Sequence, residues 1–201
     1  MLDRNIPFYN TILRCDAYQR HNITLPLGYS FSPYRAGYEK EWAKLEYDIG
    51  DFNSLEDAKN YFQRTYMQDM PFLSESAVFL LNRDERVIGS CIAWRDGKDN
   101  SAFVSSLHWL IVGEEYQGKG LGKLLCCQTM NIFAARNKFP VYIHTQPWSW
   151  KAILLYLSLG FHLQKTDSFS NYNNQYHEAM MALKAILSEK QYAMLLASTE
   201  D

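Results

Sequence analysis

Hydrophobic and polar residues follow two spacings along this chain, and the spacing predicts which segments are helices and which are strands. Apolar residues three or four positions apart predict helices at 37–49, from Ser54 to Pro71, at about 120–137 and at 149–159. Strand-like runs occupy 6–15, 29–34, 77–81, 87–94, 102–112, 141–145 and 161–165. The tail over 175–197 has helical spacing, with a last strand at 180–183 as the alternative.

The order of these elements predicts a mixed α/β (α+β) domain. Polar turns at 82–85 and 95–100 separate the three middle strands, so we expect these strands to be antiparallel neighbours. We expect an N-terminal extension over 1–26 with an extra strand, a main domain over 27–187 and a partly helical tail over 188–201.

Composition excludes several classes of protein. The net charge of the 201 residues is −2 and no basic run is present, so nucleic acid is not an expected partner. No signal-peptide core and no apolar run of about 20 residues are present, so we expect a cytoplasmic protein without a membrane partner. The cysteines lack the spacing of a disulfide framework or a zinc site, and free thiols are expected. They are Cys15, Cys91, Cys126 and Cys127.

A glycine-rich segment between the strand at 102–112 and the next helix has the composition of an anion site. The first turn of a helix has unpaired N–H groups and a partial positive charge, and glycine lets phosphate approach the backbone. Neither the P-loop pattern nor the dinucleotide fingerprint fits the register of these glycines. The segment consists of Gln117, Gly118, Lys119, Gly120, Leu121, Gly122 and Lys123.

Two spaced motifs resemble those of the GNAT superfamily, the Gcn5-related N-acetyltransferases. The first resembles Q/R-x-x-G-x-G/A, and the second, about 30 residues downstream, resembles N-x-x-A-x-x-x-Y-x-x-x-G-F. The second has Ser149 where the family has Asn. The matching residues are Gln117, Gly120 and Gly122, followed by Ala152, Tyr156, Gly160 and Phe161.

This resemblance implies an acetyl-CoA-dependent N-acetyltransferase that uses no metal and acts by direct attack of a primary amine on the thioester. It implies a splayed mixed sheet flanked by helices, in which the strands at about 104–112 and 141–145 part to admit acyl-CoA. The pyrophosphate would lie on 117–123. The further cofactor contacts would be made by Leu110, Ile111 and Val112, which would pair with pantetheine, and by Ser149 and Ala152 of the second motif.

The reaction needs an acid and a base. An alkyl amine with a pKa near 10 is only about 0.1% neutral at pH 7, and the leaving thiolate needs a proton. Tyr156 holds the tyrosine position of the motif and is the candidate acid, with a core tyrosine as the alternative. His108 is the candidate base, because it resembles a histidine at this strand position in the arylalkylamine branch of the family; a core or edge histidine is equally open.

Other ionisable residues are weaker candidates. Surface positions are expected for Glu41, Glu46 and Asp51, a solvated turn for Glu114 and Glu115, and a backbone-paired ring for His144. The amine acceptor stays open between a small molecule, a peptide N-terminus and a lysine side chain, and so does homodimer formation. Tryptophans that suggest an apolar or aromatic amine, but fit a core equally, are Trp42, Trp94, Trp109 and Trp148. The alternatives to an enzyme are a non-catalytic acyl-CoA-binding module on the same fold and a nucleotide-binding protein.

Overall fold

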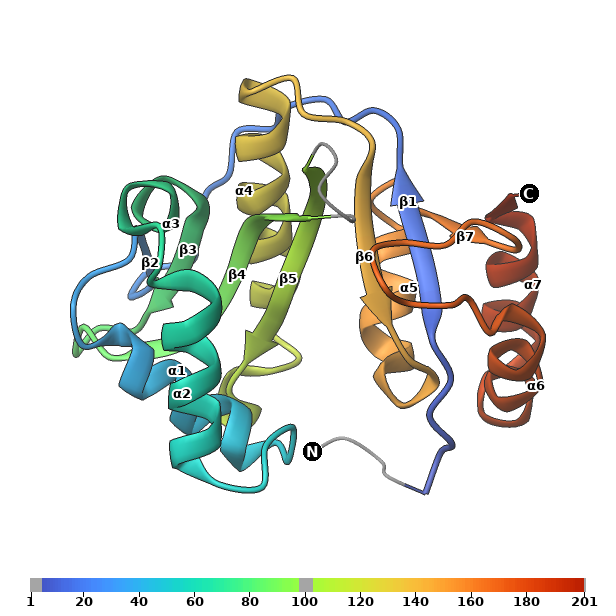
Figure 1. Ribbon diagram of the computed structural model, residues 1–201, viewed down its shortest axis with the longest axis horizontal. Helices are drawn as coiled ribbons and strands as arrows, with labels where there is room; N and C mark the ends of the chain where they lie inside the picture. Colours follow the sequence, from blue (N-terminus) through green and yellow to red (C-terminus); the bar gives the residue numbers. More distant parts are fainter. Residues whose placement is uncertain (1–4, 98–102, 201) are drawn as a thin grey trace. The chain divides into compact units, whose positions relative to one another are not determined.

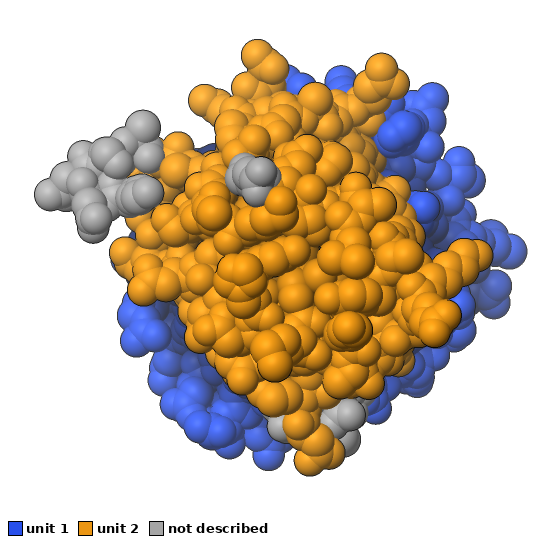
Figure 2. Space-filling view, turned by 90° about the vertical axis from the view of Figure 1, so that its right-hand side faces the viewer, with its two compact units in different colours: residues 1, 20–94, 107–135 blue, residues 2–19, 95–106, 136–201 orange. Residues whose placement is uncertain are grey.

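The computed structural model describes residues 5–97 and 103–200, which divide into two compact units (Figure 2). Unit 1 contains Arg20–Trp94 and Leu107–Ala135, and unit 2 contains 5–19, 95–97, 103–106 and 136–200. In these residues no helix has both the length and the apolar character needed to cross a membrane.

The strands hydrogen-bond in the order β2-β3-β4-β5-β6-β1-β7-β8. Antiparallel and parallel pairs both occur, so the predicted mixed α/β class is confirmed. The strands are β1 (Thr11–Cys15), β2 (Ser30–Ser32), β3 (Ala77–Leu81), β4 (Val87–Asp96), β5 (Val104–Val112), β6 (Val141–Thr145), β7 (His162–Gln164) and β8 (Thr199–Glu200). The helices are α1 (Tyr38–Asp48), α2 (Leu55–Tyr66), α3 (Met70–Ser76), α4 (Leu121–Ala135), α5 (Trp150–Leu157), α6 (Tyr176–Ile186) and α7 (Glu189–Ala197), with short 3-10 turns η1 (Glu114–Tyr116) and η2 (Pro147–Ser149).

Unit 1 is built on β2, β3, β4 and most of β5. Helices α1 and α2 pack together on one face of these strands, and α4 covers the other (Figure 1). Every residue of β3 is buried, as expected for a strand whose two faces are both covered by helices. The largest fully buried side chains between α1, α2 and β3 are the aromatic rings of Trp42, Phe62, Tyr66 and Phe79.

Helices α2 and α3 each begin at a residue whose side chain caps the helix. The Ser54 side chain accepts a hydrogen bond from the Asp57 amide, which confirms the predicted start of α2. The prediction that Pro71 closes this helix is wrong. Helix α2 ends at Tyr66, and Pro71 lies in the first turn of α3, which Asp69 caps. Proline suits that position because a first-turn N–H has no helical partner.

Unit 2 contains β6, β1, β7 and β8 with helices α5, α6 and α7. The expected extra strand near the N-terminus is confirmed as β1, which pairs antiparallel with β6 on one side and with β7 on the other. The first residues of β5 pair parallel with β6, at Ser105–Val141 and Ser106–Tyr142. The predicted extension therefore supplies an interior strand of this unit.

Residues 180–183 and 95–96 differ from their predicted structures. The alternative strand at 180–183 is wrong, because Ala179, Met180 and Leu183 are buried at helical spacing within α6. The last strand is β8, parallel to β7. In the predicted turn at 95–100, β4 continues to Asp96, and positions 98–102 lie outside the described residues.

Candidate active site

The glycine-rich segment of unit 1 forms an open backbone turn at the start of α4. Gly118 and Gly120 have φ angles of 74° and 77°, the left-handed region that glycine adopts without steric cost. A Cβ built on either residue would meet nothing within 4 Å. The turn is thus shaped by glycine backbone, and it leaves room for a group to approach.

The amides of this turn are available to an anion. Within the described residues, the N–H groups of 118–122 have no hydrogen-bond partner, and the first paired amide is that of Lys123, which donates to Gly120. Helix α4 is 15 residues long, so its dipole adds partial positive charge at this end. The predicted anion site therefore has the donors that a pyrophosphate requires.

The polar side chains of the turn make different contacts. Gln117 donates from Nε2 to the Val112 carbonyl at 2.8 Å, so it ties the turn to the end of β5. Lys119 donates to the Glu115 carbonyl and lies over the Tyr116 ring, while the Lys123 side chain is exposed. Glu114 and Glu115 are exposed in η1, which confirms their expected place on a solvated turn.

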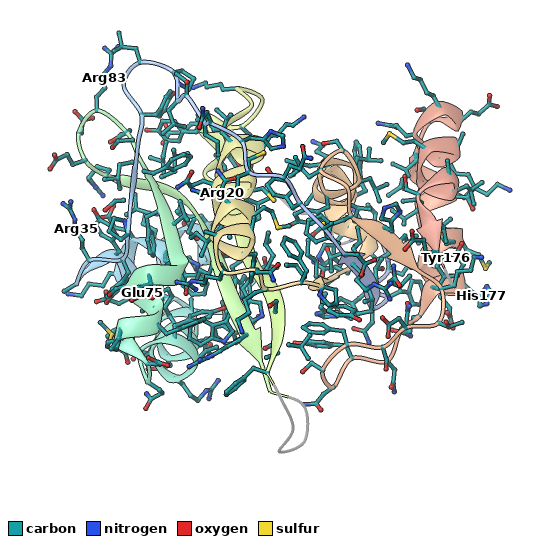
Figure 3. The ribbon with its side chains drawn as sticks, turned by 90° about the horizontal axis from the view of Figure 1, so that it is seen from above. Arg20, Arg35, Glu75, Arg83, Tyr176 and His177 are labelled. Atoms are coloured by element: carbon teal, nitrogen blue, oxygen red, sulfur yellow. The ribbon has the colours of Figure 1, made fainter. Side chains whose placement is uncertain are left out.

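Three arginines of unit 1 lie away from one another. The arginines labelled in Figure 3, which are Arg20, Arg35 and Arg83, stand apart and are exposed. The glycine turn itself contributes positive charge through its amides and through Lys119 and Lys123.

The end of β5 leads into this turn. Ile111 and Val112 are buried and Leu110 is half-buried. The Gly113 amide donates to the Ile88 carbonyl of β4 at 2.8 Å, and a Cβ on Gly89 would lie 2.6 Å from the Ile111 carbonyl. Glycine at position 89 thus allows β4 to approach β5 closely at the point where pantetheine contacts are predicted.

The candidate base, His108, is joined to a tyrosine that the sequence did not identify. Its Nδ1 lies 2.8 Å from the phenol oxygen of Tyr66, which is fully buried at the end of α2. With its proton on Nδ1, His108 donates to that oxygen and presents a lone pair at Nε2, which is the form needed to accept a proton. Tyr66 thus holds a half-buried imidazole in a defined orientation.

The second motif forms the C-terminal end of α5 in unit 2. The Phe161 amide donates to the Tyr156 carbonyl and the Gly160 amide to the Leu157 carbonyl, with Gly160 at φ 87°. This is a Schellman stop, and the rings of Tyr156 and Phe161 make its hydrophobic contact at 5.8 Å. The spacing Tyr-x-x-x-Gly-Phe is therefore also what this helix needs in order to end.

The remaining residues of this motif lie at the start of α5. The Tyr156 ring is buried, with 5% of its surface exposed, and Ala152 is half-buried. Ser149 precedes the helix and accepts a hydrogen bond from Gln146 Nε2 at 3.0 Å. Tyr156 and His108 belong to different units, and each remains a predicted catalytic residue.

The acids of α1 depart from their expected surface positions. Glu41 is half-buried and accepts hydrogen bonds from the Val87 amide and from Arg86. Glu46 is 1% exposed, so its expected surface position is wrong, and burial, with a further contribution from Asp51, raises its pKa well above the usual range. The signal was in the sequence, because Glu46 lies four residues after Trp42 on the same helix face.

The His144 ring contacts two side chains. Its Nε2 lies 2.7 Å from Asn10 Oδ1, and its ring stacks on Tyr172 with centroids 3.5 Å apart. These contacts hold β1 and β6 of unit 2 to the loop before α6. The ring is thus part of the packing of that unit, and we assign it no chemical role.

Comparison with known proteins agrees with this geometry. The family model described as the acetyltransferase (GNAT) family matches residues 37–161. A search among curated protein sequences gives no match.

Solved structures show the same fold at low sequence identity. A GCN5-related N-acetyltransferase from Sphaerobacter thermophilus has a TM-score of 0.58 at 15% identity, over 78% of this chain and 48% of its own. A GNAT acetyltransferase from Colwellia psychrerythraea has 0.58 at 12%, over 78% and 54%. The NatC complex bound to Gag peptide and CoA has 0.50 at 14%, over 66% and 83%. The chain thus spans about half the length of the first two proteins.

Proposed function

Because the chain belongs to the GNAT acetyltransferase family, we propose that it is an acetyl-CoA-dependent N-acetyltransferase acting on a primary amine. The acetyl group passes directly from the thioester to the amine, with no acetylated enzyme intermediate. Tyr156 is the proposed acid and His108 the proposed base.

The observation that carries this proposal is the row of unpaired amides at 118–122. A nearby strand end at 110–112, predicted to pair with pantetheine, leads directly into them. A pyrophosphate on these amides and the N-terminus of α4 would satisfy donors that no protein group satisfies. Gln117 and both lysines would then flank the bound nucleotide.

The proposed reaction transfers two protons. The amine nitrogen bonds to the acetyl carbonyl carbon, and the carbon–sulfur bond breaks as the tetrahedral intermediate collapses. His108 accepts a proton from the attacking nitrogen at Nε2, while the Nδ1–H bond to Tyr66 stabilises the imidazolium. The departing thiolate of CoA takes the phenolic proton of Tyr156. Leu110, Ile111 and Val112 of unit 1 would orient the acyl donor, and Ser149 and Ala152 of unit 2 stay predicted cofactor contacts.

Two measurements on one variant test this proposal. We expect Tyr156→Phe to bind CoA within about twofold of the wild type in calorimetric titration, because the ring and its packing on Phe161 remain. We expect its kcat for acetyl transfer to a primary amine to fall by about 10²-fold or more, the usual contribution of a general acid.

The opposite outcomes have distinct meanings. Unchanged kcat in Tyr156→Phe would remove this phenol from the mechanism while leaving the family assignment intact. Tight CoA binding with no acetyl transfer to any amine in a broad screen would favour the non-catalytic acyl-CoA module. Tighter binding of ATP than of CoA would favour a nucleotide-binding protein.

A further inference from the structure

Three half-exposed aromatic rings meet on unit 1 beside His108, and we call them the aromatic patch: Phe52, Tyr61 and Trp109. Phe52 stacks on Trp109 with centroids 5.5 Å apart and planes at 27°. Tyr61 meets Trp109 edge-on at 5.3 Å, and the Trp109 indole N–H donates to the Tyr61 oxygen at 3.4 Å. The patch brings together the loop after α1, the helix α2 and the strand β5.

A fully buried layer supports these rings from below. The Trp42 ring, with no exposed surface, lies 5.4 Å from Trp109, 5.9 Å from Phe52 and 6.3 Å from Tyr61. Phe62 packs against Trp42 at 5.1 Å, and it too is fully buried. The three partly buried rings of the patch thus rest on a fully buried aromatic layer, which gives a flat ligand a preformed surface.

The backbone at Trp109 holds its ring in an unusual way. Its φ of 49° lies in the left-handed region, which a bulky residue in the middle of a strand rarely adopts. Such a conformation costs energy and persists where the surroundings fix it, which is common where a side chain is presented to a ligand. Trp109 directly follows His108, so the strained residue and the proposed base are neighbours in β5.

Two buried polar atoms of α1 lack partners. Within the described residues, the Trp42 indole N–H and Glu46 Oε1 have no hydrogen bond, although both are buried on the same face of α1, one turn apart. Asp51, half-buried in the following loop, adds a second acid close enough to interact with Glu46. The aromatic faces above Trp42 favour a flat ligand over a compact polar or anionic one.

We propose that the aromatic patch binds the acceptor, and that the acceptor is a primary amine carrying an aromatic or similarly flat apolar group. This inference rests on the proposed function and names its substrate class. The flat group lies on Phe52, Tyr61 and Trp109, and the neighbouring His108 takes the proton that the neutral amine nitrogen loses on attack.

A matched pair of amines tests the substrate class. With saturating acetyl-CoA, we expect kcat/KM for 2-phenylethylamine to exceed that for n-butylamine by at least about tenfold, since a ring adds far more contact than a single methylene. Glucosamine, a polar amine, is expected to be poorer than either. Equal values for the two simple amines, or a preference for glucosamine, would overturn the inference and leave the proposed transferase activity standing.

Variants locate the effect. Phe52→Leu keeps an apolar side chain but removes one ring, and we expect it to reduce the preference for 2-phenylethylamine to below about threefold while CoA affinity stays unchanged. Tyr47→Leu is the matched control, because Tyr47 is an aromatic residue near the end of α1 that is 43% exposed and lies outside the patch. We expect it to keep the wild-type preference, and an equal loss in both variants would exclude the patch.

A binding measurement tests this inference independently of the proposed function. If no amine is acetylated, the CoA-bound protein can be titrated with 2-phenylethylamine and followed by tryptophan fluorescence. This titration tests whether the patch binds the amine. Saturable quenching that Phe52→Leu weakens at least about tenfold supports the patch as a binding site even without turnover. Absence of saturable quenching in the wild type overturns it.

Discussion

Two glutamates on the buried face of α1 show how neighbouring groups decide ionisation. Burial alone would raise the pKa of Glu39, but hydrogen bonds from the Tyr34 phenol and from backbone amides, including that of Gly37, outweigh it and lower that pKa. Glu46 has no such donor at Oε1, so burial and the charge of Asp51 raise its pKa. The same residue type on one helix face therefore favours opposite protonation states.

Replacing Glu46 should stabilise the protein most at high pH. Its folded pKa is raised, so the wild type loses stability as pH rises from the unfolded value of about 4.3 through the folded pKa. Glu46→Gln removes this loss, and we expect its melting temperature to exceed that of the wild type by a few degrees at pH 8 to 9, with little difference near pH 4. Thermal unfolding followed by circular dichroism across this range measures it.

Glu39→Gln serves as the opposite control. The lowered pKa of Glu39 contributes stability above its unfolded pKa that is lost as pH falls, so this variant should be less stable than the wild type at neutral pH. The interpretation of Glu46 would be wrong if Glu46→Gln also melted below the wild type at pH 8 to 9.

Tyr66 should act on the rate through His108. Tyr66→Phe keeps the buried ring but removes the phenol oxygen that lies 2.8 Å from His108 Nδ1, so the imidazole loses this hydrogen bond. We expect kcat to fall about tenfold while KM for the amine and the CoA dissociation constant stay within twofold. Single-turnover kinetics would check this split, and a rise in KM with kcat unchanged would indicate a purely structural role for the phenol.

At the level of elements, the glycine turn before α4 should be sensitive to backbone strain rather than to lack of space. An alanine at position 120 would find no atom within 4 Å, but it would have to adopt a φ of 77°, at a cost of about 1 to 2 kcal/mol. If the turn relaxes, its amides no longer converge on the pyrophosphate. We expect Gly120→Ala to weaken CoA binding about tenfold, as measured by calorimetry.

Two controls confine that effect to the phosphate site. Gly37→Ala has a similar strain, with φ 104° and open space around its Cβ, but lies at the start of α1. It should lower the melting temperature without changing CoA affinity. Pantetheine, which lacks the pyrophosphate, should bind wild type and Gly120→Ala alike, and a comparable loss for both ligands would argue against an amide cradle.

At the scale of the whole molecule, the sequence predicts features that depend on neighbouring residues but does not predict long-range pairings. The glycine turn, the stop of α5 at Gly160 and most helices and strands depend on neighbouring residues, so spacing reveals them. The Tyr66–His108 pair joins residues 42 positions apart, and no periodicity indicates it. The prediction at Pro71 is wrong because a proline is equally common just after the end of a helix and in the first turn of the next one.

The clearest long-range case is β1, which lies outside the segment matched by the family model but inside the sheet of unit 2. Leu13 has no exposed surface and sits between Ile143 of β6 and Leu163 of β7. We therefore expect Leu13→Ala to lower the free energy of unfolding by about 2 to 5 kcal/mol, the cost of truncating a buried leucine.

Leu27 offers the matched control, because it also precedes the family segment but is 89% exposed. Leu27→Ala should change the free energy of unfolding by no more than about 0.5 kcal/mol. Urea unfolding followed by circular dichroism compares the two variants. We expect the midpoint of the unfolding transition to shift to lower urea concentration in Leu13→Ala and to stay unchanged in Leu27→Ala. If both variants unfolded like the wild type, β1 would be an appendage; a loss limited to Leu13→Ala makes it part of the folding core that carries Tyr156.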